Sequence, residues 1–71
     1  MSEVIIARLK KSIGSEAKVF LYNGFRYIGK ITNCDDNYLE VLDYKTKSYK
    51  LIDIKEIKDA NISILDGEDV D

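Results

Sequence analysis

Residues 17–33 read AKVFLYNGFRYIGKITN, two runs of strand-forming residues on either side of Asn23-Gly24. β-Branched and aromatic residues favour strands. Asn-Gly is a strong signal for a tight hairpin, because both central residues of a type I′ turn need a positive φ. Gly29 interrupts the second run, which indicates a bulge, a sharp bend or a close approach of another backbone. We therefore predict a bent hairpin with strands over 17–22 and 25–33.

The segments around this hairpin extend it into a small, mostly β domain. Residues 2–13 predict a short amphipathic helix with Ser2 as its N-cap and Gly14 as a left-handed C-cap. Its apolar face is expected to hold Ile5, Ile6, Leu9 and Ile13. Further strands are predicted over 38–44, 49–55 and 57–65, joined by polar turns. The predicted fold class is α+β: an N-terminal helix, then a strongly bent, five-stranded antiparallel small barrel.

Length and charge indicate one domain that associates with other copies. The chain has 71 residues and a net charge of −2. We assign residues 1–65 to the domain and 66–71, DGEDVD, to an acidic tail that we expect to be disordered. A chain this short buries only about 60 % of its surface on folding, so it usually needs further stabilisation. Cys34 is the only cysteine and histidine is absent, so no disulfide can form within the chain and we expect no structural zinc site.

Composition also narrows the class of protein. Without histidine, the Ser-His and Cys-His nucleophile pairs are impossible, and we expect no enzyme, cofactor or catalytic metal. No apolar run approaches the ~20 residues of a membrane span, so we expect no membrane partner. The single unpaired cysteine is typical of a reducing compartment, which favours a cytoplasmic location.

Residues 19–42, VFLYNGFRYIGKITNCDDNYLEVL, carry a family resemblance. The residues at matching spacings are Leu21, Gly24, Tyr27, Gly29, Ile31 and Asp35. Together with the preceding helix, this pattern resembles the Sm and LSm family, which includes archaeal Sm-like proteins and bacterial Hfq. Tyr38 falls at the position of the base-stacking residue of that family.

The resemblance implies an Sm-like fold, related to SH3-like barrels, and a ring of six or seven identical subunits. Strand four of one subunit would pair with strand five of the next. Single-stranded RNA, U-rich or A-rich, would bind around the pore in RNA processing or regulation. The residues implied as RNA-binding are Asp35, Asn37, Tyr38, Lys55 and Lys58.

Two departures from the family pattern favour an alternative function. Leu39 stands where many Sm proteins have a uracil-reading Asn, although Asn37 would point the same way in a regular strand. The second family motif fits loosely at 54–56 or 57–59, but it lacks the family's Gly, Arg or His, so either Lys55 or Lys58 would occupy the loop. The alternative is a protein-interaction or scaffold module on the same barrel, without specific RNA readout.

Several of these residues also have a purely structural interpretation. Tyr38 could pack against strand two, Asp35 could hold its own turn, and the two lysines could be solvated edge charges. Cys34 is expected to be a small buried filler. Barrel or interface packing is expected for the other tyrosines and one phenylalanine, namely Tyr22, Phe25, Tyr27, Tyr44 and Tyr49.

Overall fold

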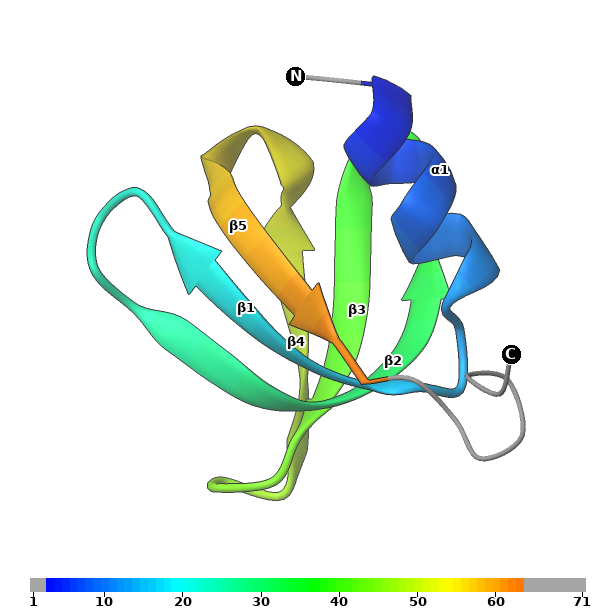
Figure 1. Cartoon of the computed structure of the whole chain (residues 1–71). Helices are drawn as coiled ribbons and strands as arrows, with labels where there is room; N and C mark the ends of the chain where they lie inside the picture. Colours follow the sequence, from blue (N-terminus) through cyan, green and yellow to red (C-terminus); the bar gives the residue numbers. More distant parts are fainter. Residues whose placement is uncertain (1–2, 64–71) are drawn as a thin grey trace.

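A computed structural model describes residues 3–63 of the chain. It contains one α-helix, five strands and a 3-10 helix (Figure 1). In chain order the elements are α1 (Glu3–Lys11), β1 (Glu16–Leu21), β2 (Arg26–Cys34), β3 (Tyr38–Asp43), β4 (Ser48–Asp53), η1 (Ile54–Glu56) and β5 (Ile57–Ile62). The predicted helix start at Ser2, the end of the last strand at 64–65 and the tail at 66–71 lie outside the described residues.

The strands form one antiparallel sheet in the order β4-β3-β2-β1-β5. The prediction of an α+β, mostly β fold with a helix before five antiparallel strands is confirmed. β4 and β5 are the two edges of this sheet, yet only η1 separates them in the chain. Asp53 and Ile57 therefore lie within about 14 Å of each other, the span of four extended residues. This short connection keeps the end of β4 near the start of β5, so the sheet is strongly curved while its two edges stay unpaired with each other (Figure 1).

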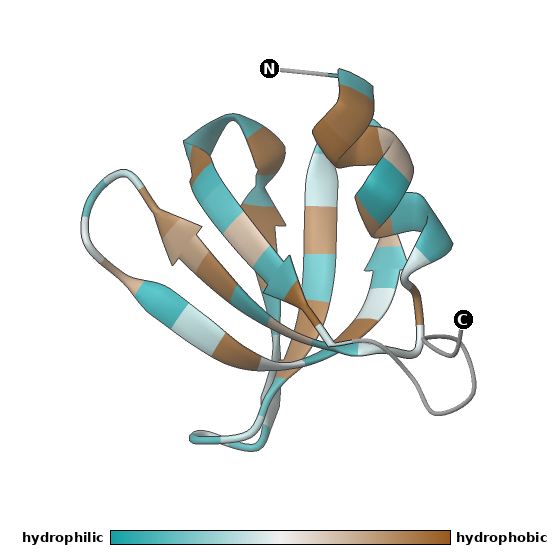
Figure 2. Cartoon of the chain, in the orientation of Figure 1, coloured by the Kyte–Doolittle hydropathy of each residue, from teal (hydrophilic) through white to brown (hydrophobic). Residues whose placement is uncertain are grey.

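The core lies on the concave side of the sheet, beneath α1. In β1, alternate residues are buried, as the two-residue period of a strand requires. Figure 2 shows brown, apolar segments alternating with teal ones along the strands. The buried apolar residues are Leu9, Ala17, Val19, Leu21, Ile31, Leu39, Val41, Ile52, Ile54 and Ile57. Within residues 3–63, no helix has the length and apolarity to cross a bilayer.

The turn between β1 and β2 differs from the predicted type. Gly24 has a φ of +94°, but Asn23 does not have a positive φ, so the type I′ prediction is wrong. The Gly24 N–H donates to the Leu21 carbonyl at 3.1 Å, and the Leu21 N–H donates to the Phe25 carbonyl at 2.9 Å. These bonds define a three-residue loop, in which only the last residue needs a positive φ. The Asn23 side chain instead accepts from the Phe25 N–H.

Gly29 marks a close approach of two strands, one of the three structures predicted for it. It lies opposite Asp43 on β3. A Cβ at this position would collide with the carbonyl oxygen of Leu42. The side chain is therefore excluded by the neighbouring backbone, and β2 can approach β3 only because residue 29 has none.

The helix is shorter than predicted. It ends at Lys11, and the Ser12 hydroxyl donates to the Arg8 carbonyl at 2.7 Å. Gly14 has the expected positive φ, but its N–H donates to Ile31 on β2 rather than to the helix. Ile13 therefore lies in the connecting turn with 49 % of its surface exposed. Its predicted place on the apolar helix face is wrong, because the helical period stops two residues earlier.

Candidate nucleic-acid interface

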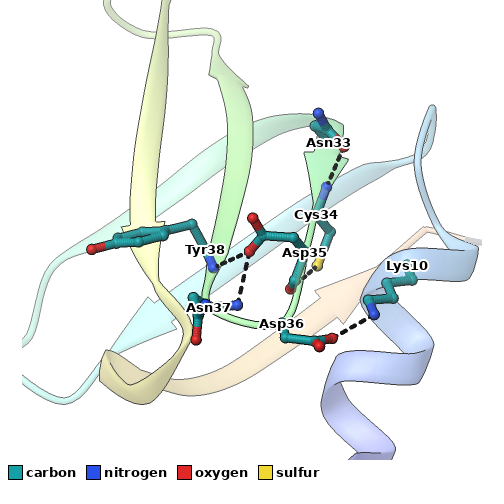
Figure 3. Close-up of polar contacts among 7 residues, drawn as sticks. All are labelled: Lys10, Asn33, Cys34, Asp35, Asp36, Asn37 and Tyr38. Carbon is teal, nitrogen blue, oxygen red and sulfur yellow. Dashed lines mark hydrogen bonds and ion pairs between the residues drawn. The ribbon is translucent and has the colours of Figure 1, made fainter.

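Asp35 builds the bend between β2 and β3. Its Oδ1 atom accepts from the backbone N–H groups of Asn37 and Tyr38, each at 2.8 Å (Figure 3). These two bonds hold the pKa of the Asp35 carboxyl below its usual value, and the bond from the Tyr38 N–H has the larger effect. The carboxylate is thus committed to the backbone, in agreement with the prediction that Asp35 holds its own turn. Its contribution to a nucleotide site would be indirect, through the position of Tyr38.

Tyr38 is the first residue of β3 and is half exposed, with 50 % of its surface accessible. Its ring points away from the polar contacts of the bend (Figure 3). Its cross-strand neighbour is Asp53 on β4, so the aromatic face is next to the edge strand. The exposure leaves room for a planar ligand, while the Asp35 bond to its N–H fixes the start of the strand.

Leu39 is completely buried, which explains one departure from the family pattern. Its side chain belongs to the core, on the face of β3 opposite Tyr38. Asn37 precedes the strand and is exposed in the bend. The alternation that would make Asn37 point the same way as Leu39 therefore does not apply. Asn37 presents its amide, which carries both donors and an acceptor, beside Tyr38 instead.

One hydrogen bond attaches η1 to this bend, and a second caps the start of η1. The Ile54 N–H donates to the Asn37 carbonyl at 2.9 Å, and the Lys55 N–H donates to Asp53 Oδ1 at 2.9 Å. Ile54 is buried in the core, and Lys55 is exposed immediately after it. The structure thus brings Asn37, Tyr38 and Lys55 to the same corner.

Lys58 has a different setting. Phe20 pairs with Asp59, and Leu21 pairs with Ile57, so Lys58 is the extra residue of a β-bulge in β5. It is exposed on the strand that follows η1. Of the two alternatives that the sequence left open, Lys55 is the lysine on the segment bonded to the Asn37 bend.

The other side of η1 is attached to the β1–β2 loop, a neighbour that the sequence did not indicate. The Tyr22 N–H donates to the Glu56 carbonyl at 3.0 Å. Tyr22 is 70 % exposed and Phe25 is 64 % exposed. Both lie outside the core because they flank a turn, so of the predicted barrel or interface packing only interface packing stays open for them. Their position next to Asn23-Gly24 was the available signal. Tyr27 is the one of the five that packs against the core, whereas Tyr44 and Tyr49 are also exposed.

An ion pair joins the bend to α1. Lys10 Nζ lies 2.6 Å from Asp36 Oδ1, and both side chains are accessible to solvent (Figure 3). The hydrogen bond and the charge of Asp36 raise the pKa of Lys10.

Cys34, which the sequence predicts as a small buried filler, is only partly buried. Its Sγ lies 3.4 Å from the Asp35 carbonyl, and burial raises the pKa of its thiol.

The corner therefore combines an exposed ring, a free amide and a lysine. Three nearby acids are already engaged: Asp35 and Asp53 with backbone N–H groups, and Asp36 with Lys10. Lys55 is exposed at this corner and has no ion pair within residues 3–63. Across residues 3–63, no group of three or more Cys, Asp or Glu residues is arranged to hold a metal ion.

No protein-family model matches this chain, and no curated protein matches it.

Proposed function

We propose that this chain is an Sm-like small barrel that forms a homo-oligomeric ring of six or seven copies and binds single-stranded, U-rich or A-rich RNA. The proposed role is non-enzymatic, in RNA processing or regulation. The observation that carries the proposal is the hydrogen bond between Ile54 and Asn37. It brings the start of β3, which holds the exposed Tyr38, next to η1, which holds the exposed Lys55.

The chemistry of the corner suits a nucleotide. A base stacked on the Tyr38 ring would gain about 1–3 kcal/mol. Lys55 would attract a phosphate as a point charge, without the fixed fork of an arginine. The Asn37 amide could donate to or accept from a base edge. Each site would be weak by itself, and a ring would link several copies and add avidity.

The sheet edges support the ring. β4 and β5 have no strand partner on their outer sides within the described residues, and neither contains proline. Unprotected edges of this kind pair readily with another strand. If β4 of one copy pairs with β5 of the next, every subunit offers one edge of each type. Assembly would then continue until the ring closes.

Two measurements test this proposal. Light scattering should give six or seven times the 8.1 kDa mass of one chain, with and without oligonucleotide. Fluorescence anisotropy with labelled oligo-U and oligo-A should show binding that weakens as salt rises. A monomer at micromolar concentration would contradict the ring, and a ring that binds neither oligonucleotide at low salt would contradict RNA binding.

The second candidate is a scaffold module on the same barrel. It is favoured by the burial of Leu39, because no Asn is available at that position to read a base. It is also favoured by the absence of an Arg-Gly pair around η1. An intact ring without measurable RNA affinity at low salt would support this function.

A further inference from the structure

Asp53 lies directly across the sheet from Tyr38. It is the last residue of β4 and pairs with Tyr38, the first residue of β3. Side chains of directly opposed residues point to the same face of a sheet, with Cβ atoms about 4.5–5.5 Å apart. Figure 3 shows the Tyr38 ring beside β4, the pale yellow strand. A base stacked on this ring would therefore have the Asp53 carboxylate next to its edge.

Only one oxygen of this carboxylate is engaged by the chain. Asp53 Oδ1 accepts from the Lys55 N–H at 2.9 Å, the bond that caps the start of η1. Within residues 3–63, Asp53 Oδ2 accepts no hydrogen bond, and Asp53 forms no ion pair. The bond to Lys55 holds the carboxyl group in place, and Oδ2 remains to accept a hydrogen bond from a ligand. Such a bond to a charged oxygen is stronger than one between neutral groups.

A carboxylate can discriminate between bases, because an ionised carboxylate only accepts hydrogen bonds. Adenine and cytosine each carry an exocyclic amino group that donates. Uracil has carbonyl oxygens on both sides of its single ring N–H, and these oxygens would face the negative charge of the carboxylate. A carboxylate is therefore a favourable neighbour for an amino-bearing base and an unfavourable one for uracil.

The other polar side chains around the ring do not reverse this preference. The Asn37 amide both donates and accepts, so it can pair with either kind of base edge. Lys55 is a mobile point charge that suits a phosphate. Glu40, two residues along β3 on the same face as Tyr38, is a second carboxylate, and its Oε1 atom already accepts from the Thr32 hydroxyl at 2.9 Å. Asp53 is thus the neighbour of the ring that best distinguishes an amino group from a carbonyl.

We propose that Asp53 sets the base preference of the Tyr38 site by accepting a hydrogen bond from an exocyclic amino group, so that adenine and cytosine bind in preference to uracil. This inference rests on the proposed RNA binding and deepens it. Of the two kinds of RNA named there, it selects the A-rich one. It also gives a role in recognition to a residue that the family resemblance did not imply.

Oligo-C and oligo-U of equal length give the sharpest comparison of bases. Both bases have a single ring, and they differ at the edge that carries an amino group in cytosine and a carbonyl in uracil. Their backbones carry the same phosphate charge, so the salt-dependent attraction is equal. Anisotropy titrations should show that the wild type binds oligo-C about 10-fold more tightly than oligo-U, as one hydrogen bond to a charged group requires. Equal affinity, or tighter binding of oligo-U, overturns the inference.

Asp53→Asn tests the residue itself. Asparagine is also a good capping residue, so it can retain the bond from the Lys55 N–H and the start of η1. Its amide both donates and accepts, so the variant should bind oligo-U nearly as tightly as oligo-C. The ratio of the two affinities should therefore fall about 10-fold. An unchanged ratio in a variant with native circular dichroism overturns the inference.

Asp59→Asn is the matched control. Asp59 is exposed on β5, and its Oδ1 atom accepts from the Ala60 N–H at 2.8 Å, so it too is a carboxylate bonded to the backbone. The substitution removes the same negative charge and can raise the affinity for both oligonucleotides. It should leave the ratio of the two affinities at the wild-type value. A change in this ratio as large as that of Asp53→Asn would overturn the placement of Asp53 at the base.

These outcomes separate the inference from the proposed function. If the wild type binds no oligonucleotide at low salt, RNA binding is removed and the inference falls with it. Binding without a base preference retains RNA binding and removes the role of Asp53. A preference for oligo-C that only Asp53→Asn abolishes supports both.

Discussion

The backbone N–H of Ile54 donates to the carbonyl oxygen of Asn37 at 2.9 Å, although the two residues belong to different connections of the sheet. Because Ile54 is also anchored in the core, the bond fixes the Asn37 bend to the interior of the domain. Tyr38 and Lys55 each follow one of the bonded residues. Their separation is consequently set by the backbone, while both side chains are free to meet a ligand.

Tyr38→Ala should weaken oligo-U or oligo-A binding about 5- to 150-fold, the range that corresponds to one lost base stack. Tyr38→Phe retains the ring and removes only the hydroxyl, so it should bind nearly as well as the wild type. Anisotropy titrations at one salt concentration measure all three proteins. Equal affinity of the Ala variant and the wild type would show that Tyr38 stacks on no base.

Lys55→Gln should reduce the salt dependence of RNA binding. Each phosphate contact with a single strand contributes a slope of about 0.7 in a plot of log affinity against log salt. The slope should therefore fall by about 0.7 for every Lys55 that contacts a phosphate in the complex. Lys58→Gln is the matched control on β5 and should change the slope less. A larger fall in slope for Lys58→Gln than for Lys55→Gln would assign the phosphate contact to Lys58 in the β5 bulge.

Gly29→Ala should destabilise the fold by more than about 3 kcal/mol, because the added methyl group meets the Leu42 carbonyl and neither backbone can yield cheaply. Gly24→Ala meets no atom within 4 Å and should cost only about 1–2 kcal/mol, from its positive φ. Urea unfolding at one protein concentration compares the two variants. A smaller loss for Gly29→Ala than for Gly24→Ala would contradict the close approach of β2 and β3.

The Asp35 carboxyl should make stability depend on pH in acid. Its pKa is lowered in the folded chain by the Tyr38 and Asn37 N–H groups, so its stabilising effect is complete above the ordinary aspartate pKa of ~3.9. The effect disappears as the pH falls through the lowered, folded-state pKa. Asp35→Asn should therefore flatten the decline of unfolding free energy below about pH 4. A decline parallel to that of the wild type would contradict this role.

Asp43 should also make the unfolding free energy fall as the pH drops in acid. It therefore provides an independent comparison with Asp35. The Thr46 hydroxyl donates to Asp43 Oδ2 at 2.7 Å and is the main cause of its lowered pKa. Asp43→Asn should flatten the same pH range. The double variant with Asp35→Asn should be flatter than either single variant, because Asp35 lies in the bend before β3 and Asp43 is the last residue of β3.

Periodicity predicted most of the fold. The strands around Asn23-Gly24 and Gly29 lie within one residue of their expected bounds, because alternation of apolar residues in a curved sheet leaves a clear pattern in sequence. The end of α1 was missed at Ile13, since an isoleucine in a turn still fits the helical period. The turn type at Asn23 was missed because a three-residue loop and a two-residue loop both use Gly24.

The candidate site was predictable only in its separate parts. The resemblance to the Sm and LSm family implied Asp35, Asn37 and Tyr38, and the structure assigns a turn-forming role to the first. The sequence could not choose between Lys55 and Lys58, because that choice depends on a hydrogen bond from η1 to a bend far away in the chain. The Lys10–Asp36 ion pair was missed for the same reason, since no local pattern records which helix faces which loop.

The pairing of β5 with β1 also determines the order in which the strands can pair during folding. Neighbouring strands from β1 to β4 pair across short turns, whereas Ala17 pairs with Ile62, near the other end of the described chain. Contacts between such distant positions close late in folding, because a long loop must be ordered first. During synthesis, one edge of β1 therefore stays unpaired until β5 has emerged from the ribosome.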